Sequence, residues 1–274
     1  MYLEYYNLKE KPFSVTADPN FLYLSKKHRE AINHMQYGIQ ERMGFLEITG
    51  EIGAGKTTVC KALLNKLDEH TKTAFILNGN LSEIQLLQAI IEDFGIQVKN
   101  KNKITMLNEL NKFLLEQLEH KNNVVLIIDE AQNLKSSLLE QIRLLSNLET
   151  EKEKLLQIIL VGQPELREKL ASRELKQLRQ RIAIRYHISP LSRHETDGYI
   201  SHRLNVAGPG NGDIFHRDAL EEIFKFSGGI PRLINIACDK SLLAGYTADK
   251  KIIDSDMVKK CFKEIEGVFD EYSQ

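Results

Sequence analysis

One glycine-rich segment constrains the fold of this chain more than any other feature. Its eight residues are Gly50-Glu51-Ile52-Gly53-Ala54-Gly55-Lys56-Thr57, which match the phosphate-loop pattern G-x-x-x-x-G-K-[ST] at every fixed position. An apolar run ends just before the segment at Ile48, and helical spacing follows it. A phosphate loop requires this strand, loop and helix context. A glycine turn that bears Lys-Thr by chance is the alternative, and the flanking pattern disfavours it.

The residue types in this segment are suited to binding an anion. Glycine reaches backbone conformations closed to other residues, so successive N–H groups can point at phosphate oxygens. A helix beginning near Lys56 adds the positive end of its dipole. We expect Lys56 to reach the β and γ phosphates and the Thr57 hydroxyl to bind Mg²⁺. The predicted nucleotide-binding residues are Gly50, Glu51, Ile52, Gly53, Ala54, Gly55, Lys56, Thr57 and Thr58.

A second candidate site motif is the acidic pair Asp129-Glu130, which ends the apolar run 124–128. The carboxyl end of a buried parallel strand lies at the sheet edge where α/β proteins bind ligands. We therefore expect Asp129 to coordinate Mg²⁺ beside Thr57, and Glu130 to polarise the attacking water as a general base. Two solvated loop acids are the alternative interpretation.

Apolar patterns predict an α/β fold followed by helices. Strand-like runs occupy 44–49, 73–77, 124–128, 157–161 and 182–188, and helical spacing occupies 57–67, 83–94, 105–118 and 136–148. This alternation implies crossover connections and a mostly parallel sheet. After Pro190 the strand pattern stops, and helical patterns follow at 194–206, 217–226, 231–245 and 254–265. The Gly-rich cluster 208–212 is predicted to be a loop within that helical part.

These patterns divide the chain into four parts. We expect an N-terminal strap at 1–25, a nucleotide-binding α/β domain at 26–190, a helical lid domain at 191–266 and an acidic tail at 267–274. The strap is rich in aromatic residues and lacks a regular pattern. It is expected to pack these aromatic side chains on the sheet domain.

Composition limits the kinds of partner and compartment. The 37 Lys and Arg balance 38 Asp and Glu for a formal charge of −1, so no whole-chain field attracts DNA or an anionic membrane. Three scattered cysteines and eight histidines show no disulfide or zinc-ligand spacing. No run of about 18 apolar residues and no signal-peptide pattern is present. We expect a protein of the cytoplasm, or of the inner face of the membrane through a partner.

Taken together, the motifs resemble those of AAA+ P-loop ATPases, and more narrowly the ExeA/GspA-type ATPases of the general secretion pathway. The motifs are Leu8-x-x-x-Pro12-Phe13, Asp18-Pro19-x-Phe21-Leu22-Tyr23, the phosphate loop, Asp129-Glu130-Ala131-Gln132, Val161-Gly162-Gln163-Pro164-Glu165-Leu166 and Gly229-Ile230-Pro231-Arg232. The resemblance extends from about Leu8 to about Glu266. The resemblance implies a three-layer fold with a parallel sheet in the order 5-1-4-3-2, a helical lid over the nucleotide, and ATP with Mg²⁺ as cofactors.

The same resemblance adds three site residues. Gln163 matches the polar sensor of the γ-phosphate or the water, although from the residues alone it is a strand-ending turn. Arg232 matches a lid-borne second sensor, with a solvated arginine at a helix start as the alternative. Arg181, or failing that Arg179, matches the arginine that acts in the neighbouring subunit's site, which requires a homo-oligomer. A solvated basic helix remains the alternative for this segment.

The function implied is ATP hydrolysis that drives assembly of a bacterial secretion or pilus-type envelope machine. Longer family members continue into a membrane segment and a peptidoglycan-binding domain. We therefore expect either a piece of such a longer protein or a short relative that works in the cytosol through a membrane-anchored secretion partner. A DNA-associated ATPase that regulates transposition is the second hypothesis, with the basic stretch 173–193 on phosphates. A nucleotide-gated scaffold without turnover is the third.

Overall fold

The structure is a computed structural model that describes residues 2–14, 19–77, 81–150, 153–208 and 214–262. It divides into two compact units. One comprises Lys26–Glu51 and Lys56–Ile188, and the other comprises Met1–Ser25, Ile52–Gly55 and Ser189–Gln274. The expected acidic tail and most of the Gly-rich cluster after Gly208 lie outside the described residues.

The first unit is built on one parallel sheet. Its strands are β1 (Phe45–Gly50), β2 (Thr71–Ile76), β3 (Asn123–Ile128), β4 (Gln157–Gly162) and β5 (Ile182–Ile188). They lie in the order β2-β3-β4-β1-β5, and every pair is parallel. This confirms the predicted order, read from the opposite edge. The strands follow the five apolar runs, although β2 begins two residues before its run.

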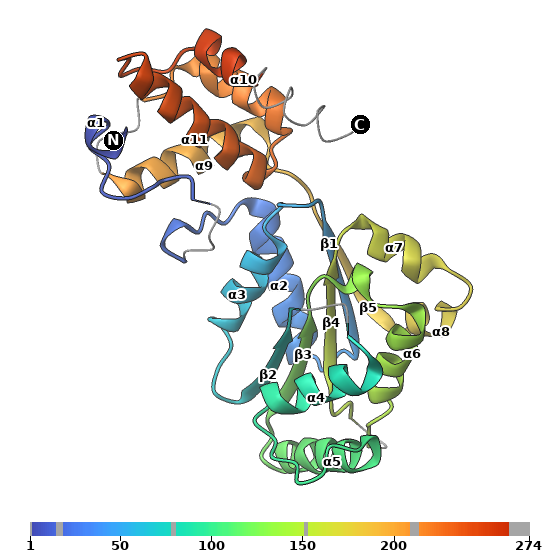
Figure 1. Cartoon of the computed structure of the whole chain (residues 1–274). Coiled ribbons are helices and arrows are strands. Elements are labelled where there is room, and N and C mark those ends of the chain that lie inside the picture. Colours follow the sequence, from blue (N-terminus) through green and yellow to red (C-terminus); the bar gives the residue numbers. More distant parts are fainter. Residues whose placement is uncertain (1, 15–18, 78–80, 151–152, 209–213, 263–274) are drawn as a thin grey trace. The chain divides into compact units, whose positions relative to one another are not determined.

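Helices cover both faces of this sheet (Figure 1). The helices α2 (Lys26–Gln40) and α3 (Lys56–Leu64) pack on one face. The opposite face carries α4 (Glu83–Asp93), α5 (Lys103–Glu119), α6 (Ser136–Leu145), α7 (Pro164–Ala171) and α8 (Lys176–Arg181), whose apolar side chains share one core with the strands. The sheet therefore lies between two helical layers, which confirms the predicted fold class.

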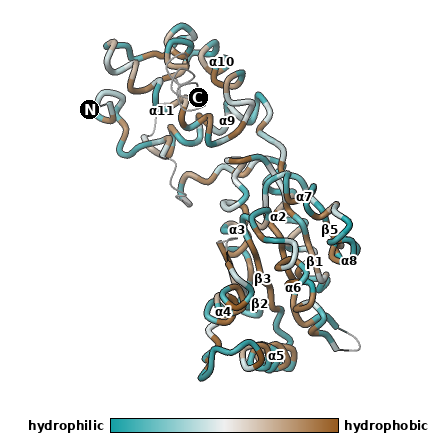
Figure 2. Tube along the Cα trace, turned by 45° about the vertical axis from the view of Figure 1, so that its right-hand side comes forward, coloured by the Kyte–Doolittle hydropathy of each residue, from teal (hydrophilic) through white to brown (hydrophobic). Residues whose placement is uncertain are grey.

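The central strands β1, β3 and β4 are buried because both of their faces are covered, whereas the edge strands β2 and β5 are partly exposed. Every residue of β1 and β4 is buried, and Figure 2 shows β3 largely in the brown of hydrophobic residues. Three polar side chains interrupt these apolar strands. Glu47, Thr49 and Gln157 are at most 3 % exposed. Buried polar groups of this kind require partners. Thr49 Oγ1 lies 3.1 Å from His187 Nδ1, and Glu47 is paired with two arginines.

The second unit is helical. It contains α9 (Arg193–Ala207), α10 (Arg217–Ser227) and α11 (Pro231–Thr247), and residues 255–262 are also helical. The N-terminal segment belongs to this unit, with α1 (Tyr2–Tyr5) and the 3-10 turn η1 (Pro19–Phe21). No helix among the described residues has both the length and the apolar character needed to cross a membrane.

The expectation that the N-terminal aromatic residues pack on the sheet domain is wrong. Tyr2, Tyr6, Phe13 and Phe21 are buried in the core that α9, α10 and α11 form. A small unit of a few helices has little apolar surface to bury by itself, and the aromatic segment completes its core. Lys9 also donates its backbone N–H to Ala207 O at 2.7 Å, at the end of α9.

Candidate nucleotide-binding site

The candidate site residues gather at the carboxyl ends of three neighbouring strands. Gly50 ends β1, Asp129 follows β3 and Gln163 follows β4. Because the sheet order is β3-β4-β1, these three ends lie side by side. Open α/β sheets bind their ligands at this edge.

The phosphate loop has the backbone that its glycines were expected to supply. Gly53 and Gly55 have φ angles of 79° and 90°, a region that residues with a Cβ rarely adopt. The helix α3 begins at Lys56, so its N-terminal N–H groups directly follow the loop. The loop thus has the conformation and the helix dipole that favour a bound phosphate.

Lys56 lies inside the turn of this loop. Its Nζ donates hydrogen bonds to Gly50 O at 2.8 Å and to Glu51 O at 2.9 Å, and the residue is only 6 % exposed. Burial lowers the pKa of the Lys56 amine, while the nearby Glu130 and Asp129 carboxylates act in the opposite direction. These carboxylates favour the charged amine, which is the form that attracts phosphate.

Thr57 and Asp129 are in direct contact. The Thr57 hydroxyl donates to Asp129 Oδ2 at 2.5 Å, and Asp129 is 1 % exposed. The other oxygen, Oδ1, accepts the backbone N–H of Glu130 at 2.8 Å, which orients the carboxylate. Both groups offer hard oxygen donors, so the pair fits Mg²⁺. Among the described residues no cluster of three His, Cys, Asp or Glu could hold a metal.

Glu130 lies beside Gln163, as the mechanism expected from the sequence requires. Its Oε2 accepts hydrogen bonds from Gln163 Nε2 at 3.1 Å and from Gln132 Nε2 at 2.5 Å. The Glu130 backbone is left-handed, with a φ of 53°, so its side chain departs from the line of the strand. The carboxylate is thus held next to Asp129 but aimed differently.

Gln132 is a site residue that the sequence analysis did not assign. It bridges the two strand ends, because its Nε2 reaches Glu130 while its Oε1 accepts the backbone N–H of Gln163 at 3.1 Å. Gly162 makes room for this bridge, since a Cβ there would lie 2.8 Å from Gln132 Oε1. The only sequence signal was its place in the motif Asp129-Glu130-Ala131-Gln132.

The three predicted arginines have different surroundings. Arg181 donates from Nη1 to Ser146 Oγ at 2.9 Å and to Asn147 Oδ1 at 2.5 Å, so it caps the end of α6. Arg179 donates to Ala171 O at 3.1 Å. Arg232 is exposed in the first turn of α11, and its backbone N–H donates to Gly53 O at 3.3 Å within the same unit.

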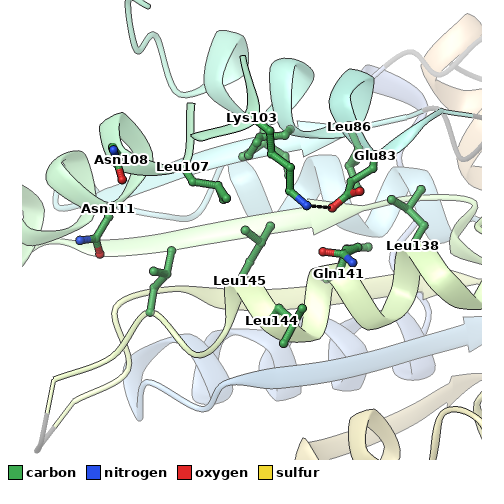
Figure 3. A pocket seen from close by; sticks show the side chains of 14 residues that line it. Glu83, Leu86, Lys103, Leu107, Asn108, Asn111, Leu138, Gln141, Leu144 and Leu145 are labelled. Carbon is green, nitrogen blue, oxygen red and sulfur yellow. Dashed lines mark ion pairs between the residues drawn. The ribbon is translucent and has the colours of Figure 1, made fainter. Parts of the chain in front are cut away.

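A separate groove of about 360 Å³ lies between α4, α5 and α6. Figure 3 shows Leu107, Leu138 and Leu145 around it, with Lys103 and Glu83 joined by an ion pair of 2.5 Å at one side. None of the predicted nucleotide or metal residues lines this groove, so it is distinct from the candidate site.

Comparison with known proteins finds a similar family. Residues 39–170 match the model of the AAA domain family. Just under half of the chain is therefore similar to AAA domains. Across 273 residues it is 44 % identical to general secretion pathway protein A of Aeromonas hydrophila, and the match covers 99 % of this chain and 50 % of that protein. The chain thus spans about half the length of this curated relative.

Solved structures show the same fold at low identity. The ORC2 protein of Aeropyrum pernix in ADPNP and ADP complexes is 16 % identical, with a TM-score of 0.69 over 93 % of this chain and 72 % of that one. Drosophila ORC bound to DNA is 18 % identical, with a TM-score of 0.72 over 97 % of this chain and 66 % of that one. At this identity the likeness extends to the fold alone.

Proposed function

We propose that this chain binds ATP with Mg²⁺ and hydrolyses it at the end of β1, β3 and β4. The observation that carries the proposal is the contact between Thr57 and Asp129, which joins the phosphate loop to the acidic strand end. The loop N–H groups and Lys56 bind the phosphates, and Thr57 and Asp129 hold the metal. Bound Mg²⁺ supplies charge neutralisation at the phosphates.

Within this proposal Glu130 accepts a proton from the attacking water. Its Oε2 is held by Gln132 and Gln163, so the carboxylate has a defined position before the water arrives. Gln163 then acts as the polar sensor, since its amide lies 3.1 Å from the general base. Positioning of the water and of the phosphoryl group accounts for most catalysis in this reaction class.

We further propose a homo-oligomer in which Arg181 acts on the neighbouring subunit's nucleotide, with Arg179 as the second choice. Both end the short helix α8 on the unit that contains the sheet. A guanidinium there would neutralise charge on the transferred phosphoryl group. Arg232 is proposed as the lid sensor. The lid domain itself is proposed at 191–266, after the α/β domain at 26–190.

For the cellular role we propose assembly of a bacterial secretion or pilus-type envelope machine. The support is the relative's name, general secretion pathway protein A, at 44 % identity. A membrane-anchored secretion partner and a location at the inner face of the membrane follow from this role. The DNA-associated alternative is not taken further, because the likeness to DNA-bound ORC extends to the fold alone.

The test is Glu130→Gln, with the exposed Glu168→Gln on α7 as its matched control. We expect Glu130→Gln to bind ATP with unchanged affinity and to hydrolyse it at least about 100-fold more slowly. Turnover is measured against protein concentration, with and without DNA at two salt concentrations. An ATP turnover rate that rises with protein concentration and does not change when DNA is added supports the proposal. Undiminished turnover in Glu130→Gln, or stimulation by DNA, contradicts it.

A further inference from the structure

Glu47 is a buried acid that ATP hydrolysis at the candidate site does not use. It lies in the middle of β1, between β4 and β5, and its side chain is 4 % exposed. Burial raises the pKa of its carboxyl group, while Arg185 and Arg167 favour the charged form. An ionised carboxylate in the core of a sheet is costly unless it is well paired. Its partners therefore indicate what it does.

Those partners are two arginines on the side of the sheet that α7 and α8 cover. Arg185 lies opposite Glu47 on β5, and its Nε is 3.3 Å from Glu47 Oε2. Arg167 on α7 is more distant, with its Nε 3.9 Å from Oε1. The closer ion pair thus joins the central strand to the edge strand.

Arg185 extends this pair to the end of α8. Its Nη2 donates to the backbone carbonyl of Arg179 at 2.6 Å. That carbonyl lies in the last turn of a six-residue helix, where it has no partner within the helix. One guanidinium therefore pairs with Glu47 through Nε and holds the end of α8 through Nη2. Arg181 follows two residues later and is anchored on α6.

We propose that Glu47 is a positioning residue for the arginines that end α8. By fixing Arg185, it holds the turn from Arg179 to Arg181 in the place from which a guanidinium is presented to a neighbouring subunit. This inference rests on the proposed function, because it requires an arginine that acts between subunits. The alternative role is that Glu47 acts on the phosphate loop of its own subunit, which begins three residues after Glu47 on the same strand.

Mixed oligomers separate these two roles. Donor subunits carry Glu130→Gln, so they present intact arginines but do not hydrolyse ATP. Acceptor subunits carry Arg179→Ala with Arg181→Ala, so they retain their own Glu130 and lack the arginines. Neither is expected to turn over ATP alone, and a mixture is expected to regain activity in the acceptor sites. Glu47→Gln is then added to the donor or to the acceptor, with the exposed Glu174→Gln as matched control.

We expect Glu47→Gln to lower the regained activity at least fivefold in the donor and to leave it unchanged in the acceptor. ATP affinity of each subunit is measured in parallel and is expected to stay unchanged. Loss of activity only when the acceptor carries Glu47→Gln overturns the inference and places Glu47 at its own phosphate loop. Equal loss in both also overturns it, because a general structural role produces that result.

If the mixture without Glu47→Gln regains no activity, the arginines do not act between subunits. That result contradicts the oligomer part of the proposed function, and the inference falls with it. The hydrogen-bond route is tested separately by amide hydrogen exchange in α8. Glu47→Gln is expected to speed exchange at residues 176–181 at least tenfold, as Arg185→Ala also should, and Glu174→Gln to leave it unchanged. Unchanged exchange in Glu47→Gln would show that Glu47 does not act through the hydrogen bond from Arg185 to α8, even if Glu47→Gln in the donor lowers the regained activity.

Discussion

The Thr57 hydroxyl donates a hydrogen bond of 2.5 Å to Asp129, a residue 72 positions later in the chain. We expect Asp129→Asn to lose most of the gain in ATP affinity that Mg²⁺ provides, by about tenfold or more, because an amide is a weaker magnesium ligand than a carboxylate. Calorimetric titration of ATP with and without Mg²⁺ measures this. The exposed Asp256→Asn in the helical unit is the control. An unchanged Mg²⁺ effect in Asp129→Asn would exclude Asp129 as a ligand.

Substitution of two glycines with positive φ separates an effect on phosphate binding from an effect of backbone strain on stability. Gly55 has a φ of 90° in the loop, and Gly95 has a φ of 74° with open space where a Cβ would stand. We expect Gly95→Ala to lower the free energy of unfolding by about 1 kcal/mol and to leave ATP binding intact. Gly55→Ala should lower ATP affinity more than about tenfold, because the loop must change to relieve the strain. Equal ATP affinities in the two variants would show that the loop conformation is not required.

Arg203 joins the N-terminal segment to α9. This arginine is 7 % exposed, donates to Pro12 O at 2.5 Å and to Ser14 O at 3.1 Å, and lies over the Phe21 ring at 4.9 Å. We expect Arg203→Ala to lower the free energy of unfolding of the helical unit by about 3 kcal/mol. Urea denaturation with hydrogen exchange at residues 2–14 checks this, with the exposed Arg217→Ala as control. Stability and exchange equal to wild type would mean that the segment is held without this side chain.

The ionisation of Glu47 makes the free energy of unfolding depend on pH, and the burial of its carboxyl group sets the sign of that dependence. Burial raises the pKa of the folded carboxyl above its unfolded value, so the folded state binds its proton more tightly. This group therefore adds stability as the pH falls through its folded pKa, and lowers stability above it. Glu47→Gln removes that dependence. Its free energy of unfolding, relative to wild type, should be higher at about pH 7 than at about pH 4. Urea denaturation at both pH values measures it, and the opposite sign would contradict a raised pKa.

The sequence predicted the strands of the sheet unit well, because the central strands, which are covered on both faces, consist mostly of apolar residues. The strand order was available only from the resemblance, since spacing alone does not order parallel strands. The helices α2, α7 and α8 were not predicted. The last two have eight and six residues, which is too short for a clear helical period, whereas α2 has fifteen residues.

Local motifs also could not show which unit the N-terminal segment packs on. Its aromatic residues signal burial, but their partners on α9 and α11 are about 200 residues away in sequence. The bridge by Gln132 forms because the ends of β3 and β4 are neighbours in the sheet. The pairing of Glu47 with Arg185 likewise forms because these residues lie opposite each other on β1 and β5. Such contacts follow from the sheet order and register rather than from a motif.

The most direct test of the account is phosphate release from ATP by the wild-type chain, measured with excess Mg²⁺ and again with the metal removed by EDTA. We predict turnover with Mg²⁺ and none above background without it, because the proposed metal ligands are the oxygens of Thr57 and Asp129, which are in direct contact. Equal turnover in both conditions, or no ATP bound in the presence of Mg²⁺, would contradict it.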